Sequence, residues 1–254
     1  MEIFHWGTVQ VNRYLDSVFA RHPDATLVQA VLLTLLGFVV IYVSFAGSAW
    51  LAVRRSPPHS MINPRALRPG QLLAEVKASV VTIAIFGLLA GMTFSLLRAD
   101  VLHVTGAVSL GQWLLEILAL YVWNEVHFYA AHRLLHLKKL MNWTHIEHHR
   151  SVIVTPFAVY RFHWFEALLL GLVMPLAMAL HNFSIWSLFM LPPLSLAWNV
   201  LGHSNWQTKQ RGLGWLARAS QRHAQHHEKP IGNFGFSLPY LDRWFGTVIT
   251  PQQA

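Results

Sequence analysis

An uncharged run of 28 residues, from Thr26 to Val53, limits what this chain can fold into. Roughly 20 apolar residues in a helix span the hydrocarbon core of a bilayer, so the run predicts a membrane helix over residues 26–53. The composition agrees, since 54% of the residues are hydrophobic, 12% are charged and the mean hydropathy is +0.38. The sequence therefore favours an integral membrane protein over a soluble globule.

Further apolar segments predict more membrane helices. Residues 78–97 form a second uncharged span, and residues 110–136 form a third that carries two acids and an asparagine. Residues 165–201 contain two apolar stretches, which favours a membrane hairpin that returns to its starting side. We expect Pro175 and the Pro192-Pro193 pair to interrupt this hairpin. The prediction is a single-domain, all-α integral membrane protein with about four to five membrane helices.

Basic residues set the expected orientation. The loop 54–70 carries four arginines and no acid, whereas the loop 98–109 has one base and one acid. By the positive-inside rule the first loop lies in the cytoplasm, and counting spans then places two histidine-rich windows, 132–149 and 203–227, on the cytoplasmic face. Since basic residues that flank spans explain the net charge of +8, we expect no nucleic-acid partner. Outside the spans we expect a short interfacial helix at 1–25 and a C-terminal tail at 228–254.

Histidines at helical spacing are the main chemical signal. Ten of the sixteen fall in residues 127–149 and 203–227. The pattern HxxHH occurs at 145–149 and 223–227, and an HxxxH pair precedes it at 132–136, so each set projects from one side of a helix. Neutral imidazoles packed in this way would leave buried polar atoms unsatisfied at about 1–3 kcal/mol each, a cost that a bound metal removes. The chain has no cysteine, which leaves imidazole and carboxylate as ligands.

Nine histidines are candidate metal ligands. One ion takes about four to six donors, so nine donors indicate two ions. A structural zinc site would need only about four ligands, usually with cysteine, whereas a surplus of imidazoles suits iron that keeps a position open for oxygen. The candidate ligands are His132, His136, His145, His148, His149, His203, His223, His226 and His227. Histidines outside the windows are expected to be structural: His5, His22, His59, His103 and His181.

The order and spacing of these three boxes resemble the membrane fatty acid hydroxylase and sterol desaturase superfamily of non-haem di-iron enzymes. The likeness runs from Glu125 to Thr247. It implies a helical cap on the cytosolic side of the membrane with a di-metal site, in which the nine histidines are the catalytic iron ligands. Further matches lie around the boxes: Tyr129 and Arg133, Arg161-Phe-His163 with Glu166, His203-Ser-Asn205, Asn233-Phe-Gly235 and Asp242-Arg-Trp-Phe-Gly-Thr247.

Through this resemblance we expect a membrane lipid oxidoreductase. Two iron ions (Fe2+/Fe3+) and O2 would hydroxylate or desaturate an unactivated C–H bond of a sterol, a fatty acyl chain or a related lipid. The 254 residues carry no cytochrome b5-like haem segment, so we expect electrons from a separate donor, either a ferredoxin or a cytochrome b5-like protein. A group of basic residues would bind either an acidic donor or anionic lipid headgroups: Lys209, Arg211, Arg218 and Arg222.

The rival interpretation is a histidine-rich membrane zinc transporter, or a metal-binding protein without redox chemistry. A transporter places its ligands near the bilayer midplane, within its spans. Here the boxes lie just past the ends of the predicted spans, which favours the enzyme.

Two positions near the boxes leave their roles open. Asn199 stands where members of the superfamily can carry a further histidine, and it would bind metal weakly or through a water. Glu125 stands where members often have aspartate. It either accepts an N–H from a metal-bound histidine of another box or pairs with an arginine such as Arg133.

Other side chains near the boxes also have alternative roles. His127 faces away from His132 on a helix, which favours an interfacial or supporting role over metal binding. His163, followed by Trp164 where members usually have proline, either supports a metal ligand or is purely structural. Four aromatic residues either line the route of the substrate or anchor the chain at the membrane interface: Trp123, Phe128, Trp198 and Trp206.

Overall fold

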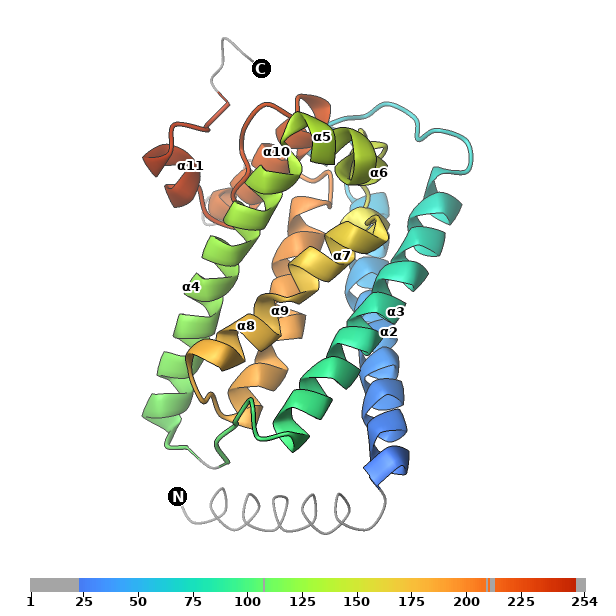
Figure 1. Ribbon diagram of the computed structural model, residues 1–254. Helices are drawn as coiled ribbons and strands as arrows, with labels where there is room; N and C mark the ends of the chain where they lie inside the picture. The colour runs from blue at the N-terminus through green and yellow to red at the C-terminus, as the bar shows by residue number, and fades with distance from the viewer. Residues whose placement is uncertain (1–22, 107, 209, 211–212, 250–254) are drawn as a thin grey trace.

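The computed structural model describes residues 23–106, 108–208, 210 and 213–249. Most of the expected interfacial helix at 1–25 therefore lies outside the described residues, as do His5 and His22. The described part of the chain is helical and contains no β-strand. Figure 1 shows a bundle of long helices that carries shorter helices at one end. The predicted all-α class is confirmed.

The long helices of the bundle are followed along the chain by the short helices of the cap. The bundle consists of α2 Pro23–Arg55, α3 Gln71–Arg98, α4 Leu110–Leu135, the consecutive helices α7 Trp164–Gly171 and α8 Val173–Leu180, and α9 Ile185–Gly202. The cap consists of α5 Lys138–Leu140, a π-helical turn Met141–His145, α6 Ile146–His149, α10 Gly214–Glu228 and α11 Tyr240–Trp244. Two short 3₁₀ turns are Pro58–Ser60 and Pro156–Tyr160.

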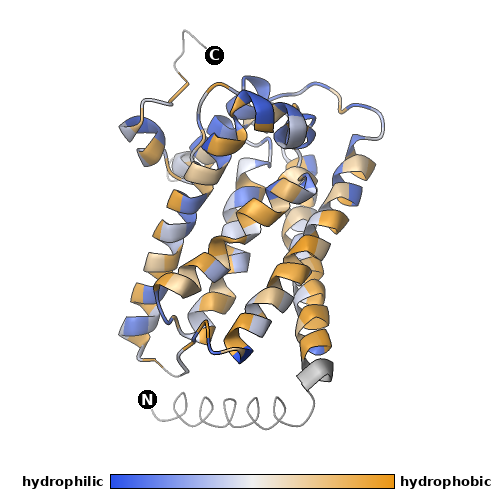
Figure 2. Cartoon of the chain, in the orientation of Figure 1, coloured by the Kyte–Doolittle hydropathy of each residue, from blue (hydrophilic) through white to orange (hydrophobic). Residues whose placement is uncertain are grey.

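Three helices are long and apolar enough to cross a membrane: Leu27–Arg55, Gln71–Arg98 and Ile185–Gly202. The stretch Trp164–Leu180 is apolar but shorter. Figure 2 shows mostly hydrophobic residues along the bundle, while hydrophilic residues lie in the cap, along α4 and in the loops at the opposite end. These helices match the predicted spans at 26–53 and 78–97 and the predicted hairpin at 165–201.

Helix α4 differs from the other long helices in its polarity. Its two acids and its asparagine, Glu116, Glu125 and Asn124, are all buried within the bundle. Its outer face is apolar, with Leu114 and Leu118 exposed. The buried polar residues lower the mean hydropathy of α4, so its crossing of the membrane at 110–136 stays a prediction.

The expected interruption at Pro192-Pro193 is wrong, whereas the first stretch of the hairpin is divided into α7 and α8 at Leu172, three residues before Pro175. Helix α9 continues through Pro192 and Pro193, and Pro175 lies inside α8. A proline removes one N–H and crowds the carbonyl four residues earlier, which bends a helix packed among neighbours without ending it. The chain turns instead before Ser184, whose Oγ accepts a hydrogen bond from the N–H of Ser187 at 3.2 Å and so begins α9.

Two apolar clusters hold the helices together. The first joins α2, α3, α7 and α9 around the 3₁₀ turn Pro156–Tyr160, and in it the rings of Tyr42 and Tyr160 stack with centroids 5.6 Å apart. The second joins α4, α8 and α9 through residues such as Leu120, Met178 and Leu191. Helix α9 contributes to both clusters, so it fixes α4 relative to α7.

The arginine-rich loop and both histidine windows lie at the same end of the bundle. Ile62 donates its N–H to the Asn205 carbonyl at 3.0 Å, just past the end of α9. Arg65 pairs with Glu228, the last residue of α10, at 2.9 Å. At the opposite end, Thr105 exchanges backbone hydrogen bonds with the loop before α9. The relative placement predicted from the spans is confirmed, and the side of the membrane on which this end lies stays a prediction.

Candidate metal centre

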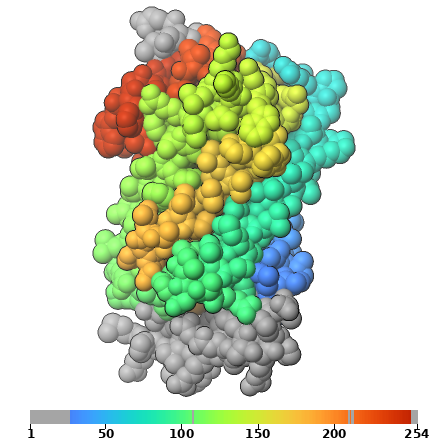
Figure 3. Space-filling view, viewed as in Figure 1, coloured from blue at the N-terminus to red at the C-terminus, as the bar shows by residue number. Residues whose placement is uncertain are grey.

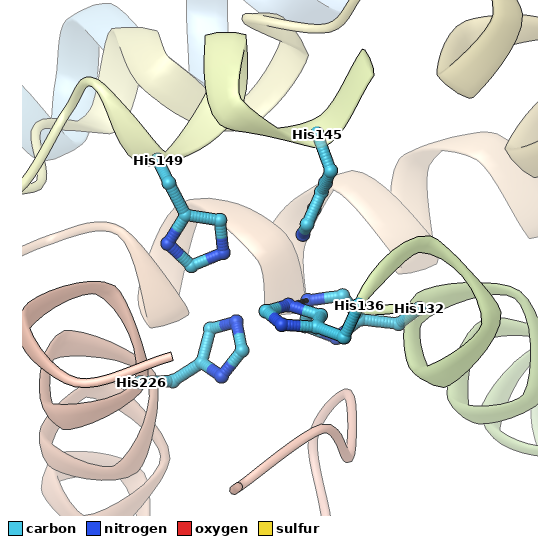
Figure 4. A group of neighbouring side chains, drawn as sticks. All are labelled: His132, His136, His145, His149 and His226. Atoms are coloured by element: carbon cyan, nitrogen blue, oxygen red, sulfur yellow. Dashed lines mark hydrogen bonds between the residues drawn. The ribbon is translucent and has the colours of Figure 1, made fainter. Parts of the chain in front are cut away.

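All nine candidate histidines meet in the cap, in two groups. Within each group one ring nitrogen per residue lies within 4.8 Å of those of the others. Eight of the rings are buried, and His136 is half-buried. Site A consists of His132, His136, His145, His149 and His226, whose rings point toward one another in Figure 4. Site B consists of His148, His203, His223 and His227.

Each HxxHH box is divided between the two sites. In the first box His145 and His149 belong to site A and His148 to site B, whereas in the second box His226 belongs to site A. In a helix of 3.6 residues per turn, neighbouring residues are about 100° apart, so one box faces two adjacent centres rather than one. The rings of His149 and His227, from different sites, have centroids only 4.7 Å apart. The sequence predicted two ions but not this division.

Ring nitrogens in site B approach one another closely. The Nε2 atom of His203 lies 3.3 Å from Nε2 of His148 and 3.0 Å from Nε2 of His223, which lies 3.1 Å from Nε2 of His227. Donors about 2.0–2.1 Å from one central cation would be separated by roughly 3.0–3.4 Å. The four Nε2 atoms therefore have the spacing of donors around a single ion.

Protein acceptors fix the tautomer of four histidines. Each of these rings has Nδ1 within hydrogen-bond distance of an oxygen, which leaves Nε2 as the free donor atom for a metal. Two of the four acceptors are carbonyls of one short segment after α10. The pairs are His132 with the Phe234 carbonyl at 2.9 Å, His226 with the Gly232 carbonyl at 2.7 Å, His203 with the Asn199 carbonyl at 2.9 Å and His145 with Glu166 Oε1 at 2.7 Å.

Several buried ring nitrogens have no hydrogen-bond partner, and a bound metal would provide one. Among the described residues, these include Nε2 of His145, His149 and His226, all in site A. Leaving such atoms unpaired costs about 1–3 kcal/mol each. A cation with imidazole ligands would satisfy all three, and donor sets made of imidazole suit iron or zinc. The residues therefore fit a metal at each site.

Burial keeps the imidazoles uncharged. Burial lowers the pKa of His203 to about 4. Burial, reinforced by neighbouring imidazoles, lowers the pKa values of His148, His223 and His227 well below 6.5. At neutral pH these rings hold free lone pairs, the form in which histidine binds a metal.

Glu166 has a role that the sequence did not reveal. Its side chain is fully buried, and its Oε1 accepts the Nδ1–H of His145. His163 supports this contact from a distance, because its ring accepts the N–H of Phe165 at 3.3 Å and so begins α7, which carries Glu166. The sequence signal that could have revealed this role is an acid, Glu166, in the first turn of a helix that begins at His163.

Neither a metal-bound histidine nor Arg133 is the partner of Glu125. Its carboxylate accepts the backbone N–H of Ser237 at 3.0 Å, the Ser237 hydroxyl and the N–H of Leu238 at 3.4 Å. Arg133 donates to the hydroxyl of Tyr129 at 3.3 Å instead of to Glu125. Glu125 therefore anchors the segment after α10 to the middle of α4.

Among the described residues, the histidines other than the nine candidate ligands belong to neither site. His127 packs against Trp123 with ring centroids 5.9 Å apart, in agreement with a supporting role. His103 lies 3.3 Å from Asp100, and His181 packs on Phe183. These contacts are structural.

A cavity lies directly beneath the two sites. Its floor combines Glu166 and Asn199 with apolar side chains, and four of the nine histidines form its roof. The side-chain amide of Asn199 donates to the Val159 carbonyl at 3.4 Å. The apolar lining consists of Phe128, Leu135, Phe162 and Leu170.

A second cavity continues down the seam between α4 and α9. Trp198 and Tyr121 line it, together with Asn124, whose Oδ1 accepts from the Ser195 hydroxyl at 3.4 Å. Asn124 is one turn from Phe128 and Ser195 is one turn from Asn199, so the two cavities follow each other along the same two helices. Phe128 and Trp198 thus line these cavities, and a substrate route through them stays a prediction.

The other two aromatic residues bind the backbone. Trp123 donates from Nε1 to the Val173 carbonyl at 2.8 Å, which joins α4 to α8. Trp206 pairs with Met61 of the arginine-rich loop. Neither is among the residues that line the two cavities.

The expected basic surface is only partly present in the described residues. Lys209 and Arg211 lie outside them. Arg218 is exposed, but Arg222 is partly buried and donates to the Ser237 carbonyl at 2.5 Å. Arg222 therefore also has a structural role, and its place in a docking surface stays a prediction.

Comparison with known proteins agrees with the geometry. The family Fatty acid hydroxylase matches residues 117–247, just over half of the chain. A Delta(7)-sterol 5(6)-desaturase of Aspergillus fumigatus is 24% identical over 253 residues, which cover 90% of this chain and 78% of that protein. A Delta(7)-sterol 5(6)-desaturase of Gibberella zeae is 27% identical over 228 residues, 85% of this chain and 67% of that protein.

A third relative, the Delta(7)-sterol 5(6)-desaturase of Candida albicans, is 25% identical over 241 residues, 90% of this chain and 58% of that protein. No solved structure matches the chain significantly. The family match covers α4 from residue 117, all three histidine boxes and the segment after α10, which are the parts that build sites A and B. The chain belongs to the fatty acid hydroxylase family, as the order of its histidine boxes predicted.

Proposed function

We propose that the chain is a membrane oxidoreductase that uses two iron ions, O2 and electrons from a separate donor to hydroxylate or desaturate a lipid. The nine histidines are the proposed iron ligands, five in site A and four in site B. The observation that carries the proposal is the division of nine mostly buried imidazoles into two adjoining groups. Site A has unpaired Nε2 atoms, and the four Nε2 atoms of site B have the spacing of donors around one ion.

The proposed reaction balances with one O2, two electrons and two protons. In hydroxylation a C–H bond becomes C–OH and one water is released. In desaturation two C–H bonds break, one C=C bond forms and two waters are released. Iron supplies the oxidising power that an unactivated C–H bond demands.

The side chains of this protein position the reactants. Glu166 and the backbone carbonyls of Asn199, Gly232 and Phe234 hold the outer N–H of four imidazoles, which aims the opposite nitrogen at the centre. Below them, apolar side chains line the upper cavity beside His132, His145 and His148, where the proposed reaction would place the C–H bond of the lipid.

The apolar walls of the two cavities suit a lipid substrate. The two cavities follow α4 and α9 from the middle of the bundle to the histidines, and their walls are mostly apolar. The relatives are named as sterol desaturases, which supports a sterol or another lipid as the substrate.

Electrons must reach the sites from outside the bundle. The arginine-rich loop and α10 lie at the same end as both sites, and Arg218 is exposed there. An acidic ferredoxin or cytochrome b5-like protein would bind such a surface. We place this end in the cytoplasm on the basis of its arginines.

Metal analysis combined with lipid analysis tests the proposal. Protein purified without oxygen should contain two irons per chain, and on reduction it should consume O2 when its lipid is present. Mass spectrometry of lipid extracts from cells with and without the protein should reveal a lipid that has gained one oxygen or lost two hydrogens. Exchangeable zinc without O2 consumption would instead favour the rival metal transporter or binding protein.

A further inference from the structure

We propose that the C-terminal segment Gly232–Thr247 is a clasp that positions two ligands of site A, and that Asp242 is the positioning residue that sets its shape. The proposal rests on the metal centre proposed above. It concerns site A alone, because the two ligand histidines that donate to clasp carbonyls, His132 and His226, both belong to that site.

The clasp contacts site A through its first three residues. The carbonyls of Gly232 and Phe234 accept the Nδ1–H groups of His226 and His132. The ring of Phe234 also packs on three site A imidazoles, with centroid distances of 5.8 Å to His132, 4.8 Å to His136 and 5.7 Å to His226. In site B, by contrast, His203 takes its acceptor from α9.

Asp242 holds these residues in place. Its side chain is 1% exposed, and it accepts the N–H of Phe234 at 2.8 Å, the N–H of Gly235 at 2.8 Å and the hydroxyl of Thr247 at 2.7 Å. Hydrogen bonds to an ionised carboxylate are shorter and stronger than neutral ones. Asp242 accepts hydrogen bonds from the N–H groups of Phe234 and Gly235. Because the Gly235 N–H and the Phe234 carbonyl belong to the same planar peptide unit, these bonds fix the direction of that carbonyl.

Two glycines allow the clasp to close. A Cβ atom on Gly232 would lie 2.4 Å from the Thr247 carbonyl oxygen, and one on Gly235 would lie 2.6 Å from Asp242 Oδ2. Between them, Asn233 has φ 55°, in the left-handed region that asparagine tolerates. Its side chain donates to the Arg222 carbonyl of α10 at 3.3 Å.

The clasp also reaches the helices that carry the ligands. The Thr247 hydroxyl lies 3.0 Å from the hydroxyl of Tyr129, one turn before His132 on α4. Figure 3 shows the end of the described chain packed against the upper part of α4. The clasp therefore joins α4 to α10, and each of these helices supplies one of the two oriented imidazoles.

Asp242→Asn is the direct test. The amide places an N–H group opposite a backbone N–H, so at least one of the two backbone hydrogen bonds is lost. Full-length protein should be loaded anaerobically with Fe2+ and, separately, with Co2+, and metal per chain and the Co2+ absorption spectrum recorded. Thr247→Val, which removes only the hydroxyl donor, is the milder second variant. Asp100→Asn is the matched control, because that side chain is 92% exposed in a loop at the opposite end of the bundle.

We expect the wild type and Asp100→Asn to hold two metals and Asp242→Asn to hold close to one. The weakened site should bind at least about tenfold less tightly, the lower end of what loss of a ligand's supporting contacts costs. The remaining spectrum should match that of His226→Ala, which disables site A, and differ from that of His227→Ala. Thr247→Val should change the metal content and the Co2+ spectrum in the same direction, but by less.

Two results would overturn the clasp while the metal centre stands. One is Asp242→Asn and Thr247→Val with two metals and an unchanged spectrum. The other is loss from both sites in equal measure, which would mean that Asp242 only stabilises the fold. A wild type without metal would overturn the proposed function and the clasp together.

Discussion

Nδ1 of His145 lies 2.7 Å from Oε1 of Glu166, and both side chains are almost completely buried. The two residues are 21 positions apart, on the π-helical turn and on α7. The carboxylate takes the only N–H of the neutral imidazole, so Nε2 faces site A. Glu166 thus couples the first HxxHH box to the helix that lines the upper cavity.

Glu166→Gln should weaken metal binding at site A. The amide is a poorer acceptor than the carboxylate, and it can present its NH2 group to the ring, which would favour the wrong tautomer. We expect affinity at site A to fall about 10- to 100-fold, while site B is retained. Metal titration of the apoprotein measures this. Glu228→Gln, an exposed change in the same cap, is the control, and unchanged affinity in Glu166→Gln would show that the carboxylate does not orient the ligand.

Substitution of one histidine from each site should abolish lipid oxidation. His148→Ala removes a ligand from site B and His226→Ala one from site A, and the proposed reaction draws on both sites. His59→Ala should retain activity, because His59 lies in the 3₁₀ turn Pro58–Ser60 outside both groups. The product is measured in lipid extracts by mass spectrometry. Retained turnover in either box variant would refute the ligand assignment.

The metal-free protein should lose stability as pH falls below about 6.5. In the unfolded chain the imidazoles take up protons near that pH, whereas burial holds the pKa of His203 at about 4 in the folded protein. The unfolded state then binds more protons, so each such histidine disfavours folding by about 1.4 kcal/mol per pH unit down to its folded pKa.

Thermal melting of chelator-treated protein in detergent, from about pH 8 to about pH 5, tests whether stability falls on acidification. The melting temperature should change little above about pH 7 and fall steadily below about pH 6.5. His103→Asn should follow the same curve, because His103 is half exposed and outside both sites. A melting temperature that stays level or rises on acidification would contradict the prediction.

Asn124→Leu should change lipid use without changing metal content. Asn124 is 6% exposed and brings an amide into a mostly apolar cavity, where only Ser195 is its hydrogen-bond partner among the described residues. Leucine keeps the size and removes both polar atoms. We expect the product profile or yield to shift severalfold with two metals per chain still bound. An identical profile would mean that substrate does not reach this cavity.

Much of the fold could be predicted from the sequence. The hairpin stretches expected at 165–180 and 185–201 are helices over Trp164–Leu180 and Ile185–Gly202, because long apolar runs favour helices in a membrane and a short turn separates them. Pro192-Pro193 misled the prediction, since the effect of a proline depends on neighbouring helices that local sequence does not specify.

The ligands were predictable, but their partners were not. The spacing HxxHH identifies imidazoles that share a helix, and all nine proposed ligands lie in the two sites. It does not reveal that Glu125 binds Ser237, 112 positions away, or that carbonyls of Gly232 and Phe234 orient two ligands. Such pairs depend on tertiary packing, and a backbone carbonyl carries no residue-type signal.

Two pairs of neighbouring histidines fix the distance between sites A and B. His148 and His149 serve different sites, as do His226 and His227, and in both pairs the ring centroids are 5.8 Å apart. A single trans peptide unit, about 3.8 Å between Cα atoms, separates the members of each pair. The peptide units that join these pairs would thus both constrain the distance between two bound ions. If α6 or α10 tilted or slid, both ions would move in the same direction and their separation would be kept.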